Sequence, residues 1–162
     1  MFPAMGKRIT SSSNPQNNSP HETLHASEGK GSYCLNLDHW AQSWAGFPKL
    51  DVPVGEKIVE EFKPFLQALG DAGYSKKTLK RYADFLWALG GEVIRHVNEE
   101  PADRKLPARE LLLRHIDETG GPYWPHAYNA RDRNAFNSVC RRLYRFMTTG
   151  VLSRPTTKRE EP

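Results

Sequence analysis

The sequence predicts an all-α fold, and three observations support that prediction. Apolar residues recur at three- and four-residue spacing in separate stretches between residues 55 and 148, as in helices buried along one face. No stretch alternates convincingly between apolar and polar residues, as a half-buried strand would. Glycine and proline interrupt the periodic stretches, most densely at residues 120–125. We therefore expect a bundle of four to five helices.

Size and composition fit one such domain with flanking tails. The chain has 162 residues, a formal net charge of +4 and a mean hydropathy of −0.70. No apolar run approaches the roughly 18 residues of a membrane span, and no apolar segment follows Lys7 and Arg8 as in a signal peptide. Cys34 and Cys140 are isolated, which favours two free thiols. We expect a cytoplasmic protein.

An aromatic arm is predicted before the main domain. Residues 1–32 are rich in small and polar residues without periodicity and are expected to be disordered. In the arm, residues 33–53, aromatic residues interrupt a polar sequence, and Asp38 could cap a short helix. Such a helix places Trp40 and Trp44 on one face, with Phe47 nearby. We expect the arm to pack on the main domain; binding of a partner is the alternative.

Four helices are expected in the main domain, residues 54–149, at about 55–69, 75–90, 107–118 and 130–148. Pro64 removes one backbone donor and predicts a kink or restart in the first. Ser75 is a good N-cap for the second, which continues past Gly90 and Gly91 as a bent or separate piece. Asn129 can cap the fourth.

The end of the fourth helix and the chain beyond it are also predictable. Gly150 is expected to end that helix. Residues 150–162 are polar and are expected to form a disordered tail.

The second and fourth of these helices share one design, with an apolar stripe inward and a basic stripe outward. Leu79, Tyr82, Leu86 and Leu89 form the apolar stripe of the second. Its expected outward cations are Lys76, Lys77, Lys80 and Arg81. The outward residues expected on the fourth are Arg131, Asn134, Ser138, Arg141, Arg142 and Arg145. Two such faces can present one positive surface to DNA phosphates.

One reading competes with that interpretation. The charged residues could form only a solvated face, because Asp84, Glu92 and Asp132 lie nearby in the sequence. Trp87 projects on the cationic side, where an exposed indole is costly. We expect it to pack on another element, with stacking on a partner as the alternative.

Two sequence blocks resemble a known family. The first is Phe65-Leu66 and Leu69, then Gly73–Tyr82 followed by Leu86 and Leu89, and the second is Val139–Met147. Their order and separation are similar to those of the core-binding, SAM-like domain of tyrosine recombinases and phage integrases, over about residues 54–149. The resemblance implies a four-helix domain that clamps one side of duplex DNA with its second and fourth helices. It carries over to Lys76, Lys77, Thr78, Lys80, Arg81, Arg141, Arg142 and Arg145.

The chain departs from that family in several respects. The loop at residues 120–125 is richer in proline and aromatic residues, and the Glu56, Glu60 and Glu61 edge would repel phosphates. No histidine has an arginine three positions later, and only a short tail follows the fourth helix. Tyr144 lacks the cationic pocket of a nucleophile. We therefore expect no catalysis.

No metal site or cofactor is expected either. His21 and His25 have helical spacing but lie in a segment without helical character. The sequence also contains no glycine-rich phosphate loop after a strand.

The function predicted from sequence is non-catalytic binding of double-stranded DNA, linked to DNA integration and recombination. The arm with Trp40, Trp44 and Phe47 could bind a recombinase or a second copy of the chain. One alternative is a protein-interaction module that uses this arm, Trp87 and the Tyr123-Trp124 loop. The other is an inactive integrase fragment.

Overall fold

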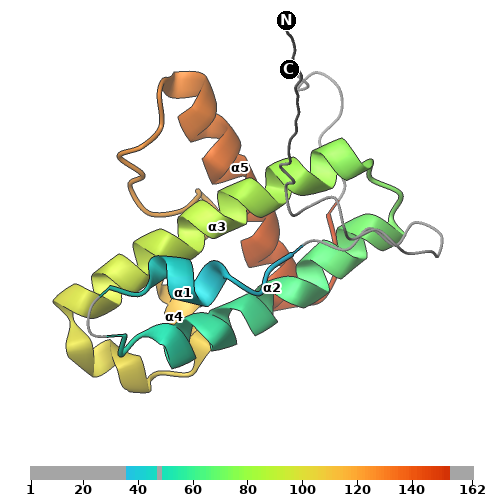
Figure 1. Cartoon of the computed structure of the whole chain (residues 1–162). Coiled ribbons are helices and arrows are strands. Elements are labelled where there is room, and N and C mark those ends of the chain that lie inside the picture. The colour runs from blue at the N-terminus through green and yellow to red at the C-terminus, as the bar shows by residue number, and fades with distance from the viewer. Residues whose placement is uncertain (1–35, 47–48, 154–162) are drawn as a thin grey trace, which may run out of the picture. The chain divides into compact units, whose positions relative to one another are not determined.

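Every regular element within the described residues is a helix, which confirms the predicted all-α class (Figure 1). The computed structural model describes residues 36–46 and 49–153, and residues from Leu37 onward belong to one compact unit. The elements are α1 (Trp40–Trp44), α2 (Val52–Asp71), α3 (Lys76–Glu99), the 3₁₀ helix η2 (Pro101–Lys105), α4 (Ala108–His115) and α5 (Ala130–Thr149). The predictions for residues 1–32 and 154–162, and for Cys34 and Phe47, lie outside the described residues.

Helix α2 runs through Pro64 without the predicted restart. Pro64 is exposed, whereas Phe62 and Phe65 on either side of it are fully buried. Burial of each phenylalanine stabilises the helix by about 2 kcal/mol, which offsets the lost backbone hydrogen bond.

Helix α3 begins where the sequence predicts and extends further. The Ser75 hydroxyl accepts a hydrogen bond from the Thr78 backbone N–H at 3.2 Å, so the predicted N-cap is confirmed. The helix then continues through Gly90 and Gly91 to Glu99 as a single element. Figure 1 shows α3 running beside α2, while α5 crosses behind it.

Helix α5 has the predicted caps. Asn129 Oδ1 accepts from the Asp132 N–H at 2.9 Å, and Gly150 ends the helix with a φ of +79°. Helix α4 is shorter than predicted, because Ile116 is extended and an isolated bridge joins Asp117 to Gly120.

The core lies between the inward faces of α2, α3, α4 and α5. Its largest fully buried side chains include Phe62 and Phe65 of α2, Leu86 of α3, Leu111 of α4 and Phe136 of α5. Within the described part of the chain, no helix has the length and apolar character needed to cross a bilayer.

The arm packs on the main domain, as predicted, through α1. Trp44 Nε1 donates to the Trp87 carbonyl at 3.0 Å, and Trp87 Nε1 donates to Ser43 Oγ at 2.9 Å. The N-cap residue is His39, one position after the predicted Asp38. Trp40 and Trp44 do share a face, with ring centroids 5.9 Å apart.

Candidate nucleic-acid interface

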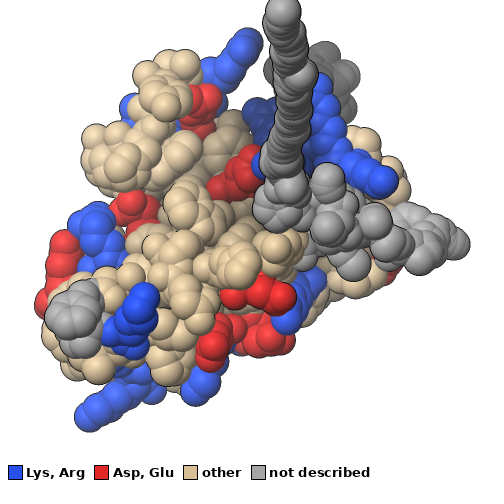
Figure 2. Space-filling model, in the orientation of Figure 1, with Lys and Arg blue, Asp and Glu red and all other residues tan. Residues whose placement is uncertain are grey.

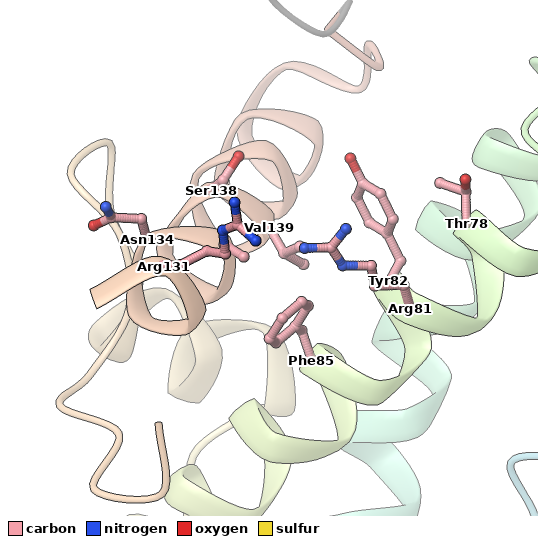
Figure 3. A pocket seen from close by; sticks show the side chains of 9 residues that line it. Thr78, Arg81, Tyr82, Phe85, Arg131, Asn134, Ser138 and Val139 are labelled. Carbon is pink, nitrogen blue, oxygen red and sulfur yellow. The ribbon is translucent and has the colours of Figure 1, made fainter. Parts of the chain in front are cut away.

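A cleft of about 740 Å³ separates α3 from α5, the two helices predicted to face DNA (Figure 3). Its lining residues are Thr78, Arg81, Tyr82, Phe85, Arg131, Asn134, Ala135, Ser138 and Val139. Five of them, namely Thr78, Arg81, Arg131, Asn134 and Ser138, are among the predicted DNA-contacting residues.

The two walls of the cleft have the same residue spacing. Helix α3 contributes Thr78 and then the residues three, four and seven positions later. Helix α5 contributes Arg131 and the residues at the same three offsets, together with Val139. These offsets place side chains on one helical face, so each helix turns a single row of side chains toward the cleft.

The cleft combines positive charge with neutral hydrogen-bonding groups. Figure 3 shows Arg81 and Arg131 extending toward each other from opposite walls, with Phe85 between the helices. The Arg81 guanidinium lies 5.8 Å from the centre of the Phe85 ring, a cation–π contact. None of the nine lining residues carries a carboxylate. An anion entering the cleft therefore meets two guanidinium groups and no acid in its lining.

Most of the other predicted DNA-contacting residues lie on the surface of the same two helices. Lys76, Lys77, Lys80, Arg141 and Arg145 are exposed and do not line the cleft. Lys80 contacts the Asp84 carboxylate at 3.2 Å, and Arg141 makes a long hydrogen bond of 3.4 Å to the Thr119 carbonyl.

Arg142 is the exception, because the prediction that it faces outward is wrong. Only 8% of its surface is exposed. Its guanidinium donates to the Tyr82 hydroxyl at 2.5 Å and to the Ser153 carbonyl, and lies 5.5 Å from the Tyr74 ring centre. Arg142 follows Val139 by three positions, so it turns toward the same side of α5 as the apolar residues. Since Tyr82 lines the cleft, Arg142 supports the α3 wall from behind.

Sequence reasoning missed the aromatic part of the cleft. The sequence places Tyr82 in the apolar stripe of its helix, and neither Phe85 nor Val139 was predicted to face DNA. Tyr82 and Phe85 are half-buried, so each contacts the core and still reaches the cleft. Tyr82 and Phe85 follow Thr78 by four and seven residues, and this helical spacing could have predicted that they share its face.

The features that depart from the recombinase family lie outside the cleft lining. Glu60 pairs with Lys63 at 2.8 Å and Glu61 with Arg109 at 3.2 Å, and no residue of α2 lines the cleft. The loop before α5 is attached to that helix, because the Gly121 N–H donates to Asn137 Oδ1 at 3.0 Å.

Other chemistry has little support in the described residues. Cys140 is buried, and burial raises the pKa of its thiol, so it is not a nucleophile at neutral pH. No group of three or more His, Cys, Asp or Glu side chains there could hold a metal ion.

Comparison of the chain with protein-family models, with curated proteins and with solved structures gives no match. The resemblance to recombinase core-binding domains therefore stays a prediction.

Proposed function

We propose that this chain is a non-catalytic domain that binds double-stranded DNA with α3 and α5. One observation carries the proposal: two helices with the same residue spacing line one cleft that holds two arginines, three neutral polar residues and no carboxylate. Its assignment to DNA integration and recombination, in the cytoplasm, rests on the sequence resemblance.

The residue types suit DNA chemically. Guanidinium groups bond phosphate oxygens in pairs, and hydroxyl and amide side chains bond phosphates or base edges. Lys77, Arg141 and Arg145 are exposed on the same helices and would add phosphate contacts beyond the cleft. Binding of this kind is mostly electrostatic, so its affinity falls steeply as salt rises.

We do not extend the proposal to a partner bound by the arm. The Trp44 indole is already engaged with the Trp87 carbonyl, and α1 packs on α2 and α3. A partner that used the Trp44 indole N–H, or the face of α1 that packs on α2 and α3, would first have to detach α1.

Fluorescence anisotropy of a labelled duplex, titrated with the full chain at low salt, tests the proposal. We expect saturable binding that the double variant Arg81→Glu with Arg131→Glu reduces at least 30-fold, since two phosphate contacts become repulsive. Lys80→Glu with Arg145→Glu tests the outer rim and should weaken binding less.

The matched control is Lys57→Glu with Lys105→Glu, which changes exposed cations on α2 and η2. Every double variant here lowers the net charge from +4 to zero, because each replacement of Lys or Arg by Glu lowers the charge by two. Absence of binding at low salt, or equal losses in the cleft and control variants, would reject the cleft as the DNA site.

A further inference from the structure

All four tryptophans of the chain line a second pocket, of about 630 Å³, on a neighbouring face of α3, and Phe85 lines both cavities. Trp40 and Trp44 come from α1, Trp87 from α3 and Trp124 from the loop before α5. Three segments distant in the sequence therefore converge on one place, and docking of the arm completes it. The volume is typical of small-molecule sites, which span about 300–1,000 Å³.

The tryptophan rings are held in fixed positions. The Trp44 ring lies directly on Gly90, so close that a Cβ there would be 2.2 Å from Cζ2. The Trp124 ring packs on Phe136 with centroids 4.9 Å apart. The indole N–H groups of Trp44 and Trp87 are already bonded to protein oxygens. These two side chains therefore offer a ligand their π surfaces rather than hydrogen-bond donors.

Two carboxylates, Asp84 and Glu92, line the same pocket. Arg95 also lines it, but this guanidinium is held by Glu92 at 2.9 Å and by Glu99 at 2.9 Å. Asp84 meets Lys80 at 3.2 Å, and both side chains are mostly exposed, so water screens that pair. Over α1 and α3, Figure 2 shows acidic side chains beside uncharged surface. The pocket thus joins aromatic faces, which attract cations, to carboxylates.

We propose that this pocket binds a methylated ammonium group. An unmethylated ammonium carries three N–H donors that each need an acceptor, and the two carboxylates of the pocket are already paired with Lys80 and Arg95. A trimethylammonium group has no donor to satisfy, spreads its charge over methyl groups and contacts ring faces favourably. The group can belong to a free small molecule or to a methylated lysine side chain of a protein.

Intrinsic tryptophan fluorescence measures this binding directly, because every tryptophan lines the pocket. The full chain is titrated with choline and, separately, with a trimethyllysine peptide. The controls are 3,3-dimethyl-1-butanol, the neutral isostere of choline, and the same peptide with unmodified lysine. We expect saturable binding of at least one methylated cation and an affinity about tenfold lower for its control. Whichever of the two methylated probes binds identifies the source of the group.

Variants of Asp84 and Trp87 test whether these side chains bind the cation. Calorimetry measures the affinity of each variant, and circular dichroism checks that it is folded. Asp84→Asn removes one charge at nearly constant shape and should weaken cation binding at least threefold. Trp87→Leu should weaken it further, while Tyr128→Leu, at a 92% exposed aromatic outside the pocket, should not. Equal affinity for choline and its neutral isostere would overturn the proposal, as would no saturable binding of either methylated probe at millimolar concentration. Binding should persist in the Arg81→Glu, Arg131→Glu protein, since those residues line the other cleft.

Discussion

Replacing Arg142 with alanine is expected to destabilise the helical unit by about 3 kcal/mol, although the neighbouring Arg141 can be replaced at little cost. Arg142 is 8% exposed, and its guanidinium bonds the Tyr82 hydroxyl and the Ser153 carbonyl. It also lies 5.5 Å and 5.6 Å from the ring centres of Tyr74 and Tyr82. One side chain thus joins α5, α3 and the segment that follows α5.

The magnitude follows from these contacts. Each hydrogen bond from a charged donor contributes about 1.5–3 kcal/mol, and the two cation–π contacts contribute about 1 kcal/mol more. Part of this gain is offset by the cost of burying the guanidinium, whose Nε has no partner in the described structure. In a domain of this size, a net loss of about 3 kcal/mol lowers the melting temperature by roughly 10 °C.

Thermal unfolding followed by circular dichroism measures the effect, and Arg141→Ala is the matched control. Arg141 is exposed, and among the described residues its hydrogen bond is the long one to the Thr119 carbonyl, so its loss should change stability by less than about 0.5 kcal/mol. In a DNA titration, Arg141→Ala should weaken binding severalfold without lowering the melting temperature. Equal melting temperatures for the two variants would refute the structural role of Arg142.

Two further predictions concern buried positions. Gly90→Ala places a Cβ 2.2 Å from the Trp44 ring and should destabilise the protein by about 2 kcal/mol. Gly91→Ala meets the same ring at 3.4 Å, an ordinary contact, and should be neutral or stabilising. Urea unfolding compares the two variants, and equal midpoints would contradict the packing of α1. Cys140 is buried with a raised thiol pKa, so in a Cys34→Ser background it should react with a thiol reagent only after unfolding. Rapid labelling of the native protein would contradict its burial.

The sequence was sufficient for features that depend on neighbouring residues. The caps at Ser75 and Asn129 and the stop at Gly150 are local hydrogen-bonding and φ preferences, and all three are confirmed. Features that depend on distant partners were not predictable. The continuation of α3 past Gly90 was predicted, but the Trp44 ring that covers this glycine was not, and the burial of Arg142 depends on two tyrosines from another part of the chain.

The candidate site shows the same division. Helical spacing put Arg81 on one outward face and Arg131, Asn134 and Ser138 on another, and the family resemblance added Thr78. That the two faces line one cleft is a tertiary fact, which no periodicity encodes. The four tryptophans were grouped from sequence only within the alternative of a protein-interaction surface, and the pocket that they line together appears when the arm is docked.

The salt dependence of DNA binding tests the central claim most directly. About five phosphates would be neutralised, by Arg81 and Arg131 in the cleft and by the exposed Lys77, Arg141 and Arg145 on the same helices. A plot of the logarithm of the binding constant against the logarithm of the salt concentration should therefore have a slope of about −4 to −5. In the Arg81→Gln, Arg131→Gln protein, the slope should be shallower by about 2. A slope near zero, or one that these substitutions leave unchanged, would contradict DNA binding through the α3–α5 cleft.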